Sequence, residues 1–311
     1  MTLDADAQAV ADRLEQFLPN GLSGLGVQGA RTFLAQLAAA SPPPPEIHEV
    51  TDRTIPGPRG EIPIRVYRPS DDRDLAVLVY FHGGGWATGD LEGGVDRLAR
   101  KLSEQAGIVV VSVDYRLAPE HPFPVPFDDA FAAVEWVAAN AESIGADRDR
   151  IAVGGDSAGA NLAAAITLRA RDAGGPDIRF QLLAYPITEY AVERPSWIEN
   201  ADAPLLTTAD VLWFWDRYLA DEADRANPLV TPSNADSLAG LPAAFILTGE
   251  HDPIRDDGEN YARLLEEAGN DVVQRHYSGV FHGFFTIAGI AKSDEAVADA
   301  VAQLNRNLGR S

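Results

Sequence analysis

Short apolar runs alternate with amphipathic stretches along most of this 311-residue chain. The runs are rich in β-branched and aromatic residues, as is typical of strands buried on both faces. Strand signals lie at 64–67, 76–81, 108–113, 151–153, 180–185, 244–248 and 272–277. Helical periodicity lies between and after them, at 97–105, 127–140, 162–171, 207–219, 258–268 and 296–308. This alternation predicts one α/β domain with a mostly parallel sheet flanked by helices.

Two segments depart from this rhythm. Residues 1–40 predict two amphipathic helices, whose apolar faces carry Val10, Leu14, Phe17 and Leu18 in the first and Phe33, Leu34 and Leu37 in the second. Prolines at 42–45 end the second helix. The insert at about 188–227 carries Tyr190, Trp197 and a Trp-Phe-Trp run. Such an insert forms a lid over the strand ends or packs into the core, and the sequence favours neither.

Composition excludes several kinds of chemistry. There is no cysteine, which excludes disulfides, thiolate nucleophiles and cysteine-bound metals. The net charge of −22 argues against nucleic acid and anionic membranes as partners. The N-terminus has no apolar core of a secretory signal, and no run is long enough to span a bilayer. These features predict a soluble, cytoplasmic protein with no stable membrane association.

A candidate nucleophile lies in the Gly-Asp-Ser-Ala-Gly sequence at 155–159. It stands between an apolar strand and an alanine-rich helix, so the chain there predicts a strand, a sharp turn and a helix. A serine at such a turn, here Ser157, presents its hydroxyl at the top of the sheet. The helix begins at the serine, and its free N–H groups and positive end therefore favour negative charge at that point.

A second glycine motif follows the strand that ends at Phe81. Residues 82–86 read His-Gly-Gly-Gly-Trp, and glycines let backbone N–H groups approach a substrate oxygen closely. We expect the N–H groups of Gly83, Gly84 and Ala158 to form an oxyanion hole for acyl transfer. His82 precedes the serine and ends a strand, so we expect it to brace the loop.

A serine nucleophile needs a base, and a carboxylate must orient that base. In this architecture the order along the chain should be serine, acid, histidine. Three histidines follow the serine: His251, His276 and His282. His276 falls within a strand and His251 precedes the favoured acid, whereas His282 lies in a glycine-flanked loop after the last strand. We therefore predict His282 as the base.

The loop at 249–258 offers several acids. Asp252 is favoured because it follows the Gly249 turn and its backbone is stiffened by Pro253, while Glu250 remains a rival. We expect the acidic residues next to helix starts to be caps or to lie on solvated faces, namely Asp128, Asp129, Asp256 and Asp257.

From about residue 47 to the C-terminus the chain resembles the bacterial hormone-sensitive lipase-like esterases, family IV of the α/β-hydrolases. The resemblance rests on the glycine motifs at 82–86 and 155–159, the Asp-Tyr-Arg-Leu-Ala-Pro-Glu sequence at 114–120, Asp252-Pro253 and the His-Gly-Phe at 282–284. It implies an α/β-hydrolase fold with an eight-stranded sheet and a helical cap formed by residues 1–45 and 188–227. The catalytic core would be 46–187 and 228–311.

The resemblance also implies a catalytic triad of Ser157, Asp252 and His282 that hydrolyses short- to medium-chain acyl esters through an acyl-enzyme. No metal or cofactor is expected, the substrate is a small-molecule ester, and a homodimer is suggested. Amidase or deacetylase activity at the same site remains an alternative. A ligand-binding receptor is a weaker alternative, because all three triad positions are filled, and so is an interfacial lipase.

Overall fold

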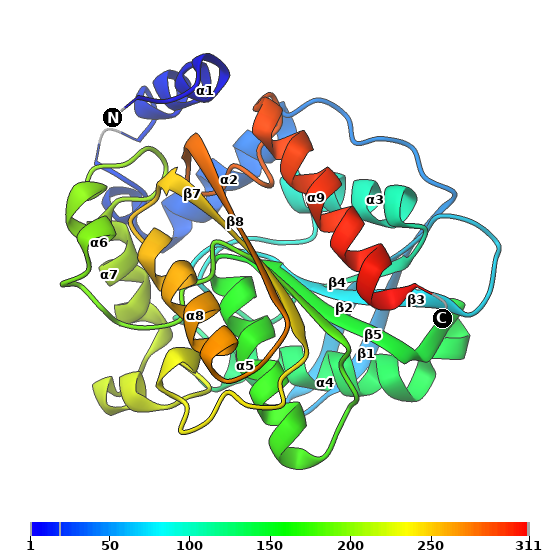
Figure 1. Ribbon diagram of the computed structural model, residues 1–311. Helices are drawn as coiled ribbons and strands as arrows, with labels where there is room; N and C mark the ends of the chain where they lie inside the picture. The colour runs from blue at the N-terminus through cyan, green and yellow to red at the C-terminus, as the bar shows by residue number, and fades with distance from the viewer. Residues whose placement is uncertain (1, 19, 310–311) are drawn as a thin grey trace.

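The computed structural model describes residues 2–18 and 20–309 and has an eight-stranded sheet at its centre (Figure 1). The sheet order is β1-β2-β4-β3-β5-β6-β7-β8. The strands are β1 (Glu49–Gly57), β2 (Gly60–Arg68), β3 (Leu75–Phe81), β4 (Val109–Val113), β5 (Ala146–Asp156), β6 (Phe180–Ala184), β7 (Ala243–His251) and β8 (Val272–Phe281). β2 pairs antiparallel with β1 and β4, and every other pair is parallel. The predicted fold class is confirmed.

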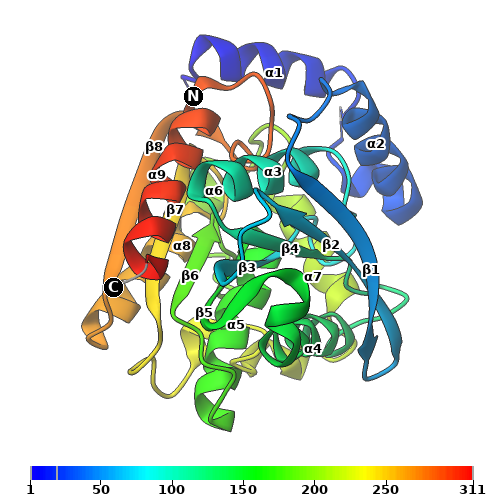
Figure 2. The same ribbon diagram turned by 90° about the vertical axis from the view of Figure 1, so that its right-hand side faces the viewer.

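Helices cover both faces of the sheet (Figure 2). The α-helices are α1 (Ala5–Glu15), α2 (Gly26–Ala40), α3 (Gly94–Ala106), α4 (Val125–Asn140), α5 (Ala158–Ala173), α6 (Pro195–Glu199), α7 (Thr208–Tyr218), α8 (Arg255–Glu267) and α9 (Ala291–Leu308). Short 3₁₀ segments are η1 (Ser23–Leu25), η2 (Ala141–Ile144), η3 (Glu222–Ala226) and η4 (Pro232–Asn234). Helices α3 and α9 pack on one face, and α4, α5 and α8 pack on the other.

Strand β3 shows why the apolar runs in the sequence are continuous. Its Val77, Val79 and Phe81 pack into one apolar cluster, beneath α4 and α5. Leu78 and Tyr80 belong to a second cluster, beneath α3 and α9. Because both faces are covered, every position of the strand favours an apolar residue.

Strand β1 and helix α6 were not predicted from the sequence. β1 is the edge strand of the sheet, and along it only Ile55 is fully buried. Its exposed positions carry Asp52, Thr54 and Pro56, so it lacks the apolar signal of the central strands. Helix α6 spans only five residues, which is less than two turns of periodicity.

The turn after β5 packs against the end of β3 with no spare room. A Cβ added to Gly159 would lie 2.0 Å from the backbone oxygen of Phe81, and one on Gly155 would lie 2.5 Å from the same atom. Only glycine allows this approach at either position. The contact holds the residue that follows β5 beside the residue that follows β3.

The N-terminal helices lie together at one end of the molecule (Figure 2). The backbone N–H of Asp4 donates to Gly279 O at 2.9 Å, and Asp6 accepts a hydrogen bond from Ala291 N at 2.7 Å. The start of α1 is therefore tied to the last part of β8 and to the first residue of α9, on either side of the loop that joins them. In α2, Arg31 donates to the carbonyl oxygens of Ala87 and Ala118 and forms an ion pair with Glu120.

We expect Gly159→Ala to lower the free energy of unfolding by about 3 kcal/mol, because its methyl group overlaps fixed backbone atoms. Urea unfolding would measure this change. Gly269→Ala is the matched control. Apart from its two chain neighbours, no atom of residues 2–18 and 20–309 lies within 4 Å of its added methyl, and its φ of +85° opposes alanine, so we expect a loss of about 1 kcal/mol. Equal losses in the two variants would contradict the packing argument.

Candidate active site

The structure brings three predicted residues together at the carboxyl ends of β5, β7 and β8. Nδ1 of His282 lies 2.7 Å from Oδ2 of Asp252, and Nε2 lies 2.9 Å from Oγ of Ser157. Asp252 is fully buried, and its Oδ1 accepts a hydrogen bond from Ile254 N at 2.9 Å. The carboxylate thus has fixed partners on both oxygens, and the imidazole links it to the serine.

Ser157 occupies a strained backbone conformation, with φ 55° and ψ −119°. Such strain in a non-glycine residue is typical of functional sites. Its N–H donates to Ala184 O at 2.8 Å, which secures the turn to β6. Ala158 is the first residue of α5, and its N–H has no hydrogen-bond partner among the described residues.

The rival acids and bases have other partners. Glu250 accepts a hydrogen bond from Gly279 N at 2.7 Å, His251 contacts Thr2 O, and His276 faces Glu259. None of them contacts Ser157.

The prediction of a helix cap or solvated position is wrong for three aspartates, Asp129, Asp256 and Asp257. Asp129 is fully buried and pairs with Arg116 at 2.6 Å. The side chains of Asp256 and Asp257 do not cap α8 but bind the insert, at Ser196 N and Trp197 Nε1.

Each glycine of the loop after β3 meets a different constraint. A Cβ on Gly83 would lie 2.4 Å from Oδ2 of Asp156. Gly84 has a φ of +115°, and a Cβ there would lie 2.3 Å from Thr88 O. A Cβ on Gly85 would lie 2.1 Å from Cγ of the Phe214 ring. The loop is therefore packed on three sides and is not a flexible tether.

The prediction that Gly83 donates to a substrate oxygen needs correction. Its N–H already donates to Oδ1 of Asp156, at 3.1 Å. The backbone N–H groups of Gly84 and Gly85 have no partner within the part of the chain that the structure describes. The sequence motif could not reveal this difference, because it depends on a side chain 73 positions away.

His82 braces the glycine loop, as its position suggested. Its Nδ1 lies 2.8 Å from Gly83 O, and its ring stacks on Tyr115 with a centroid distance of 4.3 Å. The Tyr115 hydroxyl donates to His82 O at 2.6 Å. Tyr115 belongs to the motif at 114–120, so this motif supports the loop from behind.

The insert also supports the loop that carries Asp252, a role that sequence reasoning missed. Asn200 Nδ2 donates to Asp252 O at 3.1 Å, and Ser196 Oγ donates to Pro253 O at 2.8 Å. Both side chains are buried. Ser196 and Asn200 are common residue types with no motif around them, and no signal in the sequence could have found them.

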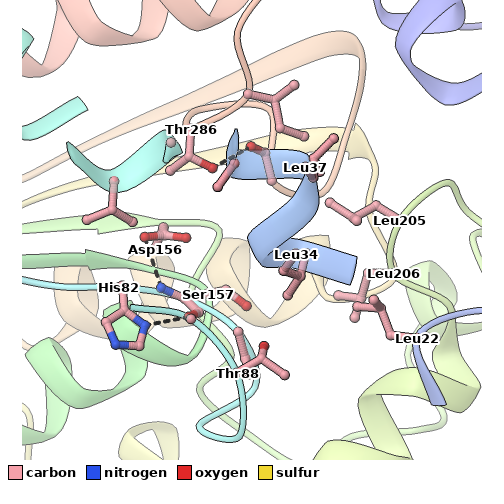
Figure 3. A pocket seen from close by; sticks show the side chains of 18 of the residues that line it. Leu22, Leu34, Leu37, His82, Thr88, Asp156, Ser157, Leu205, Leu206 and Thr286 are labelled. Atoms are coloured by element: carbon pink, nitrogen blue, oxygen red, sulfur yellow. Dashed lines mark hydrogen bonds between the residues drawn. The ribbon is translucent and has the colours of Figure 1, made fainter. Parts of the chain in front are cut away.

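A cavity of about 810 Å³ has Ser157 and His282 in its wall. In Figure 3, Leu22, Leu205 and Leu206 lie across the pocket from His82 and Ser157. Most of its other walls are apolar side chains from α1, α2 and the insert, among them Val10, Leu14, Phe33, Leu34, Leu37, Val211 and Phe214.

Two aromatic features of the sequence divide between pocket and core. Phe17 was predicted on the apolar face of the first helix, but it lies beyond the end of α1, is 65% exposed and lines the pocket. In the insert, Trp197 and Trp215 are buried in the core, whereas Phe214 lines the pocket. The insert therefore combines both roles that the sequence left open.

Among residues 2–18 and 20–309, no group of three histidine or acidic side chains is arranged to hold a metal ion. In the same residues, no helix is both long and apolar enough to cross a bilayer.

Residues 78–286 match the model of a protein family whose description is 'alpha/beta hydrolase fold'. The chain therefore belongs to the α/β-hydrolase family.

Known relatives narrow this class. The chain is 45% identical to the carboxylesterase NlhH of Mycobacterium tuberculosis, over 91% of this chain and 90% of that protein. It is 37% identical to an ethyl acetate hydrolase of Pseudomonas putida, over 79% of each. The crystal structure of a thermostable esterase from Pseudomonas putida ECU1011 matches with a TM-score of 0.93 at 37% identity, covering 100% of this chain and 99% of that one. These similarities confirm the predicted resemblance to esterases of the hormone-sensitive lipase type.

We expect Asp257→Asn to change how stability depends on pH. Burial raises the pKa of Asp257 well above its usual value, although the Trp197 hydrogen bond opposes the shift. Stability is therefore lost as the pH rises from about 4, the pKa of an unfolded aspartate, through the folded pKa. Asparagine does not ionise, so the Tm advantage of Asp257→Asn should grow between pH 4 and pH 8.

Asp6→Asn provides a control of opposite sign. The hydrogen bond from Ala291 N lowers the pKa of Asp6, so the stability that Asp6 contributes is lost only as the pH falls below about 4, the pKa of an unfolded aspartate, and is constant above it. The Tm deficit of Asp6→Asn should therefore stay nearly constant from pH 5 to pH 8 and shrink below pH 4. A constant Tm difference for Asp257→Asn between pH 4 and pH 8 would contradict the assignment.

Proposed function

We propose that this chain is a serine carboxylesterase that hydrolyses short- to medium-chain acyl esters through an acyl-enzyme. The observation that carries the proposal is the position of His282, which bonds the buried Asp252 on one side and Ser157 on the other. This arrangement joins a nucleophile, a base and a carboxylate that orients the base. The predicted homodimer stays a prediction.

In the proposed mechanism, neutral His282 takes the proton of Ser157 as its Oγ attacks the ester carbonyl. The carbonyl oxygen gains negative charge, which the free N–H groups of Gly84, Gly85 and Ala158 stabilise at the positive end of α5. His282 then protonates the leaving alcohol, and the acyl group remains on Ser157. Water repeats the attack and releases the acid. Asp252 fixes the imidazole tautomer and stabilises its charged form.

The cavity supports the proposed substrate class. Its volume of about 810 Å³ falls in the range of small-molecule sites, and its apolar walls suit an acyl chain of several carbons. Ethyl acetate hydrolase, a relative named for a short ester, supports the same class.

We expect Ser157→Ala to lower kcat on p-nitrophenyl butyrate by about a millionfold, as the loss of a triad nucleophile does elsewhere. The matched control is Ser112→Ala. Ser112 is buried in β4, outside the cavity lining, and its loss should leave kcat unchanged. Paraoxon should add one diethylphosphoryl group to the wild-type peptide that contains Ser157. Near wild-type turnover by Ser157→Ala would refute the proposal.

A series of p-nitrophenyl esters from acetate to palmitate tests the substrate class. We expect kcat/KM to rise with the first methylenes, since each buried methylene contributes about 0.8 kcal/mol. It should then fall for palmitate, whose chain exceeds the proposed class. A maximum at palmitate would indicate a lipase and contradict the proposed class while leaving the triad intact.

A further inference from the structure

Asp156 is a buried carboxylate next to the nucleophile Ser157. The proposed mechanism gives it no role. It is 7% exposed, and its Oδ1 accepts two hydrogen bonds, from Tyr80 Oη at 2.9 Å and from Gly83 N at 3.1 Å. Figure 3 shows it close to Ser157 and His82 at one side of the pocket. Burying a carboxylate costs free energy unless hydrogen bonds or an ion pair compensate for the lost water.

The loop approaches Asp156 more closely than a residue with a side chain would permit. A Cβ on Gly83 would lie 2.4 Å from Oδ2 of Asp156 and 2.9 Å from its backbone oxygen. Glycine is thus required at position 83 for the contact with Asp156, while the N–H groups of Gly84 and Gly85 have no partner among the described residues.

We propose that Asp156 is a positioning residue that aligns the N–H groups of Gly84 and Gly85 with Oγ of Ser157. The inference rests on the proposed function. Asp156 precedes Ser157 in the chain, and Gly83 precedes Gly84, so one hydrogen bond links the nucleophile to the glycine side of the anion site. Donors in such a site must be held to within about 0.5 Å, which requires supporting contacts of this kind.

The useful property of Asp156 is its acceptor oxygen and not its charge. A negative charge beside the site would oppose the oxyanion that forms there. Burial raises the pKa of Asp156, although the hydrogen bond from Tyr80 and the nearby His82 and His282 lower it. Asparagine has the same shape and keeps an oxygen that accepts from Tyr80 and Gly83. Asp156→Asn should therefore retain the function, whereas Asp156→Ala should lose it.

The test compares Asp156→Ala, Asp156→Asn and Tyr80→Phe on p-nitrophenyl butyrate. It also measures the Ki of an alkyl trifluoromethyl ketone, whose serine adduct places an oxyanion in the site. We expect Asp156→Ala to lower kcat about 100-fold, as the loss of an oxyanion donor does. Ki should rise in parallel, and KM should change little. Asp156→Asn should stay within a few-fold of wild type, and Tyr80→Phe should lose about fivefold, the worth of one hydrogen bond.

Tyr67→Phe is the matched control. Tyr67 is also buried and donates to an aspartate, Asp96, at 3.0 Å, but neither residue lines the cavity. It should destabilise the protein like Tyr80→Phe without changing kcat or Ki. If Asp156→Ala does not fold, the comparison of the two tyrosine variants decides the question.

Three results would overturn the inference: wild-type kcat and Ki in Asp156→Ala, equal losses in the alanine and asparagine variants, or the same kcat in the two tyrosine variants. Labelling of Ser157 by paraoxon separates these from failure of the proposed function. Without labelling of the wild type, the proposed function itself fails. With normal labelling, only the role of Asp156 is refuted.

Discussion

The site depends on one close contact, that of the turn after β5 with the end of β3. The backbone oxygen of Phe81 lies where a side chain on Gly155 or Gly159 would be. Because β3 and β5 are neighbouring parallel strands, this contact brings the nucleophile and the glycine loop to the same edge of the sheet. The proposed anion site is therefore assembled from two strand ends, and neither would form it alone.

Three buried aspartates around this edge have different roles, and their partners decide which. Asp252 bonds an imidazole and a backbone N–H, so it can orient a base. Asp156 bonds a loop N–H and a phenol. Asp257 bonds an indole of the insert, and its Oδ2 has no partner in the part of the chain that the structure describes. In a chain with a net charge of −22, such partners distinguish these few carboxylates from the many that lie in solvent.

The features that sequence predicts well are those that local pattern determines. The alternation of elements predicted the sheet, and the order of Ser157, Asp252 and His282 matches the groups that meet in space. The features it missed depend on contacts between distant segments. The N–H of Gly83 is occupied because Asp156 faces it. Asp257 bonds Trp197 of the insert, 60 positions away, and β1 carries few apolar residues because it lies at the sheet edge. No local pattern encodes such pairings.

The ties between α1 and the β8–α9 loop have a consequence for how the enzyme fails on heating. Asp4 bonds Gly279 near the end of β8 and Asp6 bonds Ala291 at the start of α9, on either side of the loop that carries His282. Lys292 adds an ion pair to Asp4 at 2.8 Å. Segments joined in this way open as one cooperative unit, and a terminal helix is among the first to open. Fraying of α1 thus removes a wall of the pocket and loosens the base together. Heat inactivation would then begin before the sheet unfolds.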